Sequence, residues 1–358
     1  MKAWILHDIN DIRYEETQTP EPKSGEVCIR VMAAGVCGSD IPRIFETGAH
    51  KMPLIPGHEF SGIVEETGDG VNSTWKKKRV GVFPLIPCGK CEPCKNGHPE
   101  MCRNYDYVGS RRDGAFAEKV MVPASNLIEL PENVSFEAAA MLEPMAVAVH
   151  AMRIFSGDEV LVDHNTKIVV CGLGTIGLLL TAFLIEKGYK NVFVIGRREE
   201  QKKRAMSIGV RDDHYIDGRS SDVSTVITDR LGSADVFFEC VGKNECVNLG
   251  INILAPAGTL VTVGNPYSDM EFTRDTYWKI LRNQLTVKGT WNSTFLKNNK
   301  TEDAPDDWQY VIKRLAEGTV NPELLITHRL SSEDLYQGFA IMKDKTEDYC
   351  KVMMVCSI

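Results

Sequence analysis

The sequence predicts an α/β protein built from a β-rich part and a doubly wound parallel sheet, and two observations support this fold class. Short β-like runs separated by glycine and proline fill residues 1–150, a pattern typical of an irregular barrel. From Lys167 onward, strand and helix patterns alternate, as they do in parallel α/β sheets. The 358 residues suffice for two cores at roughly 100–200 residues per domain. We therefore expect one domain over 1–150, a second over 151–290, and a return of 291–358 to the first.

The individual elements follow from hydrophobic periodicity and from turn residues. Strands of the first part are expected at Lys2–His7, Glu26–Ala34, Phe60–Thr67, Arg79–Phe83 and Gly114–Pro123. Phe136–Phe155 is expected to be one helix that connects the two parts, and Asp348–Val355 is expected to be a strand. In the second part the expected strands are Lys167–Cys171, Asn191–Ile195, Asp235–Glu239, Thr259–Val263 and Leu285–Lys288. Helices such as Thr175–Lys187 and Glu199–Ile208 lie between them.

Composition and charge exclude several classes of partner. With 41 basic and 49 acidic residues the net charge is −8, which disfavours nucleic acid and argues against a nucleic-acid-binding zinc ribbon. The apolar stretch 168–185 is interrupted by glycines and reads as strand, turn and helix, and not as a membrane span. The N-terminal apolar run is too short for a signal peptide. We therefore expect a cytoplasmic protein whose partners are small molecules, with no membrane or nucleic acid.

Four of the eleven cysteines are closely spaced, as Cys88-x2-Cys91-x2-Cys94-x7-Cys102. Disulfides do not persist in a reducing compartment, so clustered cysteines of this spacing indicate zinc. Four thiolates fill a tetrahedral shell, which makes this ion structural. The spacing differs from that of iron–sulfur ferredoxins. The region 88–102 is therefore expected to be a structural zinc lobe.

A glycine pattern G-x-G-x-x-G follows the first strand of the second part and begins a helix. Gly172 is expected to form the tight turn, Gly174 to admit the pyrophosphate of a dinucleotide, and Gly177 to let the helix pack on the strand. The start of this helix then faces the phosphate charge. Further candidate cofactor contacts are Thr175, Ile176, Val241, Val263 and Gly264.

The end of the second strand of this sheet bears on the choice of nicotinamide cofactor. An acidic residue there would bind the ribose 2′-hydroxyl of NAD. This chain has Gly196 at that place, followed by Arg197 and Arg198, which favours the 2′-phosphate of NADP(H) over NAD(H). Both arginines could instead be a solvated helix start in an NAD-binding protein.

A second set of metal-ligand types is spread along the first part. Cys37, His58 and Glu59 supply a thiolate, an imidazole and a carboxylate, and Glu143 lies in a largely apolar segment where an unpaired carboxylate would be costly. Three protein ligands leave a fourth position for water or a substrate oxygen, as catalytic zinc requires. Taken singly, His58 or Glu143 would more often be a hydrogen-bonded core residue.

These motifs resemble those of the zinc-containing medium-chain alcohol and polyol dehydrogenases, over essentially the whole chain. The likeness rests on Gly57-His58-Glu59, the four-cysteine lobe, Leu142-Glu143-Pro144 and the glycine loop. It implies a GroES-like catalytic domain and a Rossmann domain with the active site in the cleft between them. It implies one catalytic zinc on Cys37, His58 and Glu143, with Glu59 as an exchangeable ligand, one structural zinc, and a homodimer or homotetramer.

Within this family, the segments 39–45, 48–50 and 105–114 are similar to those of enzymes acting on phosphorylated polyols. The expected reaction is hydride transfer between a secondary alcohol of a polyol phosphate and NADP(H) or NAD(H), giving a ketose phosphate. The alternatives are an unphosphorylated polyol or sugar and a pentitol phosphate. Ser39 is expected to relay the proton, or else to cap a helix, and Pro42 stands where many relatives carry a relay histidine, which His50 or water could replace. Candidate substrate contacts are Arg43, Arg111, Arg112, Trp291 and Asn292.

Overall fold

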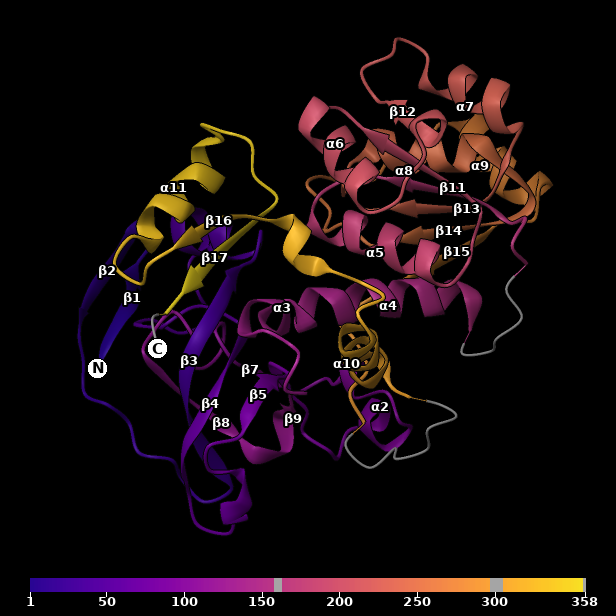
Figure 1. The fold of residues 1–358 in the computed structure, drawn as a ribbon. Helices are drawn as coiled ribbons and strands as arrows, with labels where there is room; N and C mark the ends of the chain where they lie inside the picture. The colour runs from indigo at the N-terminus through magenta and orange to yellow at the C-terminus, as the bar shows by residue number, and fades with distance from the viewer. Residues whose placement is uncertain (158–162, 297–304, 357–358) are drawn as a thin grey trace. The chain divides into compact units, whose positions relative to one another are not determined.

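The computed structural model describes residues 1–157, 163–296 and 305–356 (Figure 1). The chain divides into two compact units. The first comprises Met1–Ala146 and Ser293–Ile358, and the second comprises Val147–Asn292. The divisions fall after residues 146 and 292, whereas the sequence predicts them after 150 and 290.

The first unit is built on a seven-stranded mixed sheet with the order β16-β17-β3-β4-β5-β9, in which β8 also pairs with β3. Its strands are β3 (Glu26–Val36), β4 (Glu59–Thr67), β5 (Arg79–Val82), β8 (Lys119–Pro123), β9 (Leu127–Glu129), β16 (Ile326–Leu330) and β17 (Lys351–Val355). The central strand β3 is apolar over most of its length and is buried on both faces, as its position between neighbours requires. β17 pairs with β3 in antiparallel orientation, so the C-terminal segment completes this sheet (Figure 1).

Shorter elements surround the sheet of the first unit. Two small antiparallel pairs are formed by β1 (Lys2–Asp8) with β2 (Asp11–Glu16) and by β6 (Leu85–Ile86) with β7 (Asp106–Tyr107). The helices are α1 (Asp40–Pro42), α2 (Glu92–Lys95), α3 (Phe136–Ala140), α10 (Asp307–Glu317) and α11 (Leu335–Asp344). Single helical turns are η1 (Arg43–Thr47), η2 (Ser73–Trp75), η3 (Pro99–Met101), η4 (Ala124–Asn126) and η6 (Pro322–Leu325). Helix α4 (Leu142–Ser156) carries the chain from the first unit into the second.

The second unit contains a six-stranded sheet in which every neighbouring pair is parallel. Its order is β12-β11-β10-β13-β14-β15, so the chain order reverses between β10 and β13. This is the strand order of a dinucleotide-binding Rossmann sheet, where ligands bind beyond the carboxyl ends at the reversal. The strands are β10 (Lys167–Cys171), β11 (Asn191–Gly196), β12 (Tyr215–Asp217), β13 (Ala234–Glu239), β14 (Leu254–Thr262) and β15 (Thr286–Gly289). The connecting helices are α5 (Thr175–Glu186), α6 (Glu199–Ser207), η5 (Asp212–His214), α7 (Val223–Leu231), α8 (Asn244–Ile253) and α9 (Arg274–Arg282).

Two predicted elements of the first unit were wrong in extent. The helix predicted over Phe136–Phe155 is interrupted at Met141, because Pro144 has no N–H to donate to the carbonyl of Ala140. The strand predicted over Gly114–Pro123 begins only at Lys119. Before it, the N–H groups of residues 114–116 donate to the carbonyls of residues 55–57, and residues 116–118 bond to β1 through an isolated bridge between Ala3 and Ala117.

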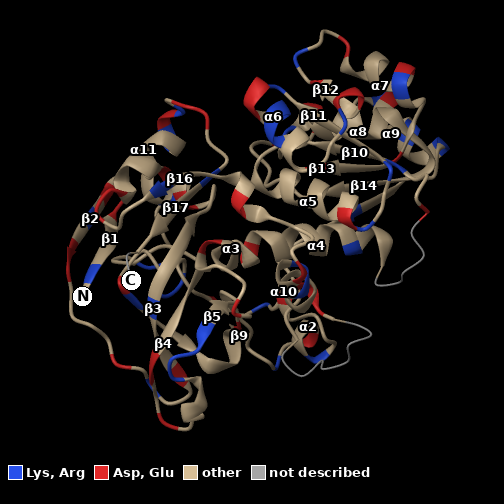
Figure 2. Ribbon diagram, in the orientation of Figure 1, with Lys and Arg blue, Asp and Glu red and all other residues tan. Residues whose placement is uncertain are grey.

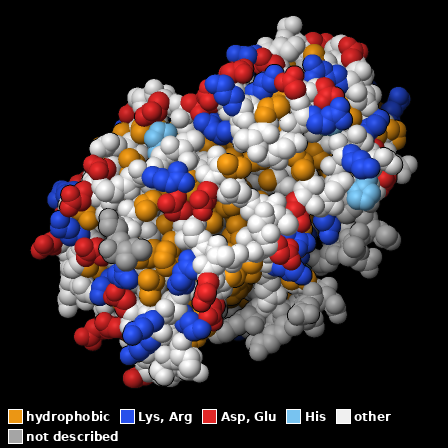
Figure 3. Space-filling model, viewed as in Figure 1, with side chains coloured by type: hydrophobic (Ala, Val, Ile, Leu, Met, Phe, Trp, Pro, Cys, Tyr) orange, Lys and Arg blue, Asp and Glu red, His pale blue; other side chains and the backbone are white. Residues whose placement is uncertain are grey.

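No helix in the described ranges is both long enough and apolar enough to cross a membrane. Acidic and basic residues are interspersed along the ribbon in Figure 2, and their side chains are intermixed on the face seen in Figure 3. On the face shown, the described residues form no large basic patch of the kind that attracts a polyanion.

Candidate functional site

The first candidate metal site lies where two strands of the first unit, β3 and β4, meet. Cys37 follows β3, His58 precedes β4, and Glu59 is the first residue of β4. The antiparallel register pairs Gly35 with Glu59, which brings the end of one strand to the start of the next. One potential ligand atom from each of Cys37, His58 and Glu59 lies within 4.8 Å of the others. The thiol, imidazole and carboxylate are ligand types that zinc accepts.

Close backbone packing holds the segment that carries His58. Gly57 has φ +99°, and a Cβ there would lie 2.8 Å from the ring of Phe116. A Cβ on Gly109 or Gly114 would approach the carbonyl oxygen of Gly57 to 2.3 or 2.2 Å. Only glycine therefore fits at these three places, and the packing fixes the chain direction at His58.

The carboxylate of Asp40 contacts two of the metal-ligand candidates, Cys37 and His58. It is fully buried, its Oδ2 accepts a hydrogen bond from the Cys37 N–H at 3.1 Å, and its Oδ1 lies 3.5 Å from His58 Nδ1. Arg43 donates to the same carboxylate at 2.5 Å. Although burial opposes ionisation, the charges of His58 and Arg43 hold the pKa of Asp40 below its usual range. Asp40 therefore orients the imidazole, a role that the sequence analysis did not assign to it.

A buried ion pair joins Glu59 to Lys351, the first residue of β17. The Lys351 Nζ donates to Glu59 Oε2 at 2.5 Å and to the Val36 carbonyl at 3.2 Å. The two side chains are 3% and 2% exposed. A Cβ on Gly35 would lie 2.5 Å from the same Glu59 oxygen, so the glycine makes room for the pair. Lys351 was not among the predicted site residues, and the one hint in the sequence is its position at the start of an apolar strand.

Glu143 and Ser39 lie beside this cluster. Glu143, in the first turn of α4, is not part of the group of three, and its Oε1 accepts a hydrogen bond from the Tyr107 hydroxyl at 3.2 Å. Burial raises the pKa of Glu143 to about 7, against the opposing charge of His58. Ser39 stands at the start of α1 but makes no capping bond, and its hydroxyl donates to Cys37 Sγ at 3.3 Å. The capping role considered for Ser39 is therefore wrong.

The four cysteines of the predicted zinc lobe converge around α2. Their sulfur atoms all lie within 4.8 Å of one another, with Cys91 Sγ 3.4 Å from Cys94 Sγ and 3.8 Å from Cys102 Sγ. All four are free thiols. Zn–S bonds of about 2.3 Å place tetrahedral ligands roughly 3.8 Å apart, which matches these separations. Backbone N–H groups of Arg103 and Cys94 lower the pKa of Cys91 to about 6, which favours the thiolate that zinc binds.

The glycine loop of the second unit lies at the carboxyl end of β10, next to the reversal in strand order. Gly172 has φ +100°, and a Cβ on Gly177 would lie 1.9 Å from the Gly172 carbonyl oxygen. By contrast, a Cβ on Gly174 would meet nothing within 4 Å. Thr175 and Ile176 then begin α5, whose first N–H groups follow directly after this open position. The loop has the geometry of a phosphate cradle.

The remaining cofactor candidates lie at the ends of neighbouring strands. Gly196 ends β11, and Arg197 and Arg198 follow it with exposed side chains. Beyond β13 the buried carboxylate of Glu239, also missed in the sequence, accepts from the Val241 N–H at 2.8 Å. The amides at 263 and 264 donate to the Glu239 carbonyl. Glu239 therefore shapes this edge of the sheet through its hydrogen bonds.

The candidate substrate contacts have different surroundings. Arg43 pairs with Asp40, and Arg112 pairs with Glu26 at 2.5 Å, so both guanidinium groups already have a carboxylate partner. Arg111 lies 4.6 Å above the ring of Tyr105. Outside this group, His50 is exposed in the first unit, whereas Trp291 (54% exposed) and Asn292 belong to the second.

Comparison with known proteins agrees with both units. Residues 23–132 match the alcohol dehydrogenase GroES-like domain and residues 175–317 match the zinc-binding dehydrogenase family. The chain is 35% identical to galactitol 1-phosphate 5-dehydrogenase of Escherichia coli K12, over 94% of this chain and 95% of that protein. The chain belongs to the zinc-binding alcohol dehydrogenase family. As a member, the dehydrogenase is an oxidoreductase that uses zinc and a nicotinamide cofactor, and its GroES-like and Rossmann folds confirm the predicted fold class.

Solved structures extend this likeness. That of the Escherichia coli galactitol-1-phosphate dehydrogenase has a TM-score of 0.89 at 32% identity, covering 99% of this chain and 100% of the other. A zinc-binding dehydrogenase of Sinorhizobium meliloti 1021, bound to NADP, has a TM-score of 0.87 at 26% identity and coverage of 99% and 98%. An alcohol dehydrogenase of Escherichia coli CFT073, bound to NADH, has a TM-score of 0.88 at 27% identity and coverage of 99% and 99%.

Proposed function

We propose that the dehydrogenase transfers hydride between a secondary alcohol of a polyol phosphate and NADP(H), giving a ketose phosphate. The observation that carries the proposal is the convergence of Cys37, His58 and Glu59 within 4.8 Å, with the Ser39 hydroxyl 3.3 Å from the Cys37 sulfur. A ligand set of this kind beside a hydroxyl group suits the oxidation of an alcohol. The similarity to galactitol 1-phosphate 5-dehydrogenase supports a phosphorylated polyol.

Cys37, His58 and Glu143 would hold a catalytic zinc ion, with Glu59 as an exchangeable ligand. Zinc bound there supplies a Lewis acid that lowers the pKa of an alcohol hydroxyl. The four cysteines at 88, 91, 94 and 102 would hold a second, structural ion.

The protein's own groups then prepare the site for proton removal. Asp40 holds His58 in orientation through its buried carboxylate. Lys351 balances the charge of Glu59, so that the site does not carry several uncompensated carboxylates. Ser39 Oγ would accept the hydroxyl proton of the substrate while releasing its own proton to solvent or to His50, since Pro42 has no side chain able to carry a proton.

Arg111 is our candidate for binding the substrate phosphate. Arg43 and Arg112 are neutralised by Asp40 and Glu26, and so offer less charge to a phosphate. The guanidinium of Arg111 lies over an aromatic ring, a contact that leaves its N–H groups able to bind an anion.

A panel of galactitol 1-phosphate, galactitol and pentitol phosphates, assayed with NADP and NAD while bound zinc is counted, tests the proposal. We expect the phosphorylated hexitol to be preferred and two zinc ions per chain. Arg111→Ala should raise KM for the phosphorylated substrate about tenfold, whereas Arg103→Ala, an exposed arginine paired with Glu92, should not change it. Equal turnover of galactitol and its phosphate would refute the phosphate assignment, and activity without the ion at Cys37 would refute the mechanism.

We also propose that the chain assembles as a homodimer or homotetramer. The helix α9 exposes Tyr277, Trp278 and Leu281, and the edge strand β15 exposes Val287. Exposed aromatic groups beside an unpaired strand edge favour pairing with a second copy. Light scattering measures the mass, and Leu281→Glu should shift it toward the monomer. A monomeric wild-type protein would refute the assignment.

A further inference from the structure

The adjacent strands β11 and β12 end together in the second unit. The parallel register pairs Gly196 with Asp217, and the N–H of Gly218 donates to the Gly196 carbonyl at 2.7 Å. Gly196 occupies the place at which a dinucleotide fold that prefers NAD carries an acidic residue. An acidic residue is therefore present on the adjacent strand, as Asp217, and Glu199 at the start of α6 lines the same cavity.

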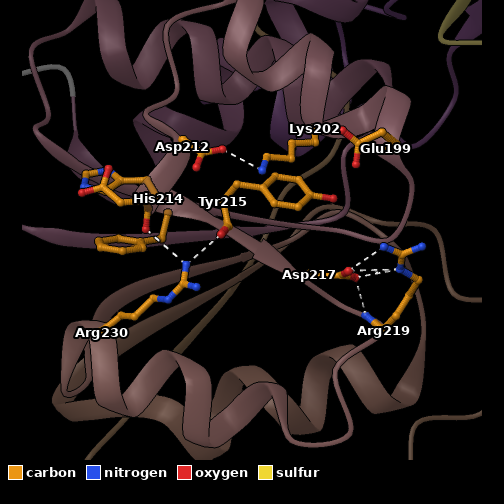
Figure 4. Close-up of a pocket in the computed structure, with 10 residues that line it drawn as sticks. Glu199, Lys202, Asp212, His214, Tyr215, Asp217, Arg219 and Arg230 are labelled. Atoms are coloured by element: carbon orange, nitrogen blue, oxygen red, sulfur yellow. Dashed lines mark hydrogen bonds and ion pairs between the residues drawn. The ribbon is translucent and has the colours of Figure 1, made fainter.

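Asp217 is bound by Arg219 through both of its carboxylate oxygens (Figure 4). Arg219 Nε lies 2.9 Å from Oδ1 and 3.1 Å from Oδ2, and Arg219 Nη2 lies 2.6 Å from Oδ2. The Arg219 backbone N–H donates to Oδ1 at 2.9 Å. The two side chains are 43% and 61% exposed, and they line one end of a cavity of about 600 Å³. The pair is therefore accessible to a ligand at this edge of the sheet.

Arg197 lies on the other side of the same turn. A Cβ on Gly218 would be 3.1 Å from Arg197 Cγ, so the stem of the arginine passes directly beside the residue that links Asp217 to Arg219. Two exposed arginines, at 197 and 219, thus flank one carboxylate. Without Arg219, the charge of Asp217 would oppose a phosphate and would suit a ribose hydroxyl, which it could accept from. With Arg219 bound, the negative charge is balanced.

We propose that the Asp217–Arg219 ion pair, together with Arg197, selects between a phosphate and a hydroxyl group on the 2′ carbon of the adenosine ribose. Arg219 neutralises Asp217 and presents its own N–H groups to the phosphate, as a bidentate guanidinium does. This inference rests on the proposed function, because it requires the nicotinamide cofactor to bind at the glycine loop of the same unit.

Calorimetric titration with adenosine 2′,5′-bisphosphate and with AMP tests the inference without any turnover. Relative to wild type, Arg219→Ala should lower the ratio of bisphosphate affinity to AMP affinity about tenfold. Asp217→Asn should raise that ratio, because it removes the opposing charge and releases Arg219. The kcat/KM ratio for NADP over NAD should move in the same directions.

Arg211→Ala is a matched control. Arg211 forms a similar exposed ion pair with Asp213, at 2.5 Å, in the turn η5 before β12, and Asp213 lines the same cavity but is not paired with Gly196. This variant should leave the affinity ratio unchanged. Circular dichroism and the melting temperature verify that each variant is folded.

The outcomes separate this inference from the proposed function. If wild type binds neither nucleotide, the proposed cofactor site is wrong and the inference falls with it. If wild type binds AMP or the bisphosphate, and Arg219→Ala and Asp217→Asn each change the affinity ratio less than about twofold, the inference alone is wrong. A change in Arg211→Ala equal to that in Arg219→Ala would also overturn it, because the effect would then be general electrostatics.

Discussion

Replacing Lys351 by methionine tests the buried ion pair that joins the C-terminal strand to the candidate metal site. Methionine keeps most of the side-chain volume and removes the charge. Lys351→Met would leave the Glu59 carboxylate, which is 2% exposed, without its cation, and would leave the Val36 carbonyl without its donor. The change therefore isolates the electrostatic contribution of one side chain.

The expected cost follows from the burial of both partners. Breaking a buried ion pair by removing one member costs roughly 3–5 kcal/mol, because the remaining charge stays desolvated. At 3% and 2% exposure, little solvent screening reduces this value. Adding Glu59→Gln to Lys351→Met removes the unpaired charge. The double variant should therefore lose roughly 1–3 kcal/mol less free energy of unfolding than the sum of the losses in the two single variants.

Urea unfolding followed by tryptophan fluorescence measures the free energy of unfolding for wild type, both single variants and the double variant. Lys2→Met is the control, because Lys2 forms a comparable pair with Glu333 on the surface of the same unit, where the side chains are 44% and 70% exposed. That control should leave the unfolding midpoint unchanged. A loss below about 1 kcal/mol in Lys351→Met, or strict additivity in the double variant, would refute the reasoning.

Three further predictions follow from the same structure. Gly174→Ala should leave the melting temperature unchanged, since its Cβ meets nothing within 4 Å, but should weaken binding of NADP about tenfold. Gly177→Ala should lower the free energy of unfolding by about 2 kcal/mol in a urea titration, because its Cβ would lie 1.9 Å from the Gly172 carbonyl oxygen. Equal effects of the two variants on stability would contradict this. Cys102→Ser should remove one zinc equivalent by elemental analysis and lower the melting temperature, and an unchanged zinc content would show that the lobe does not bind it. Burial lowers the pKa of His214 below 6.5, so on acidification the unfolded state takes up a proton before the folded state does. The contribution of His214 to stability is therefore present above pH 6.5 and is lost as the pH falls. His214→Gln should reduce the difference in the free energy of unfolding between urea titrations at pH 7 and pH 5, and an unchanged difference would refute this.

Local motifs made part of the site predictable. The glycine loop and the four-cysteine lobe each lie within a few residues, and the chemistry of such motifs follows from residue type and spacing. The parallel sheet of the second unit likewise follows from its alternating pattern of strands and helices.

Contacts between distant residues were not predictable. Lys351 bonds to a carboxylate 292 positions earlier, and this contact exists only because β17 pairs beside β3. Arg112 looked like a phosphate contact because it is basic, yet it pairs with Glu26, 86 positions away. Charge alone does not reveal a partner that the sheet register supplies. Asp40 is close in sequence to Cys37, but its role in orienting His58 depends on a separate loop that brings the imidazole to its carboxylate.

The position of β17 has a consequence for how the protein is made. The second unit is one continuous stretch, 147–292, and the ribosome can finish it while the last strand of the first unit is still untranslated. Until then, residues 33–36 of β3 lack their partner strand β17, and Glu59 lacks its lysine. A nascent chain stalled before residue 351 would therefore hold a finished nucleotide-binding half next to an unfinished one, and would be a substrate for chaperones.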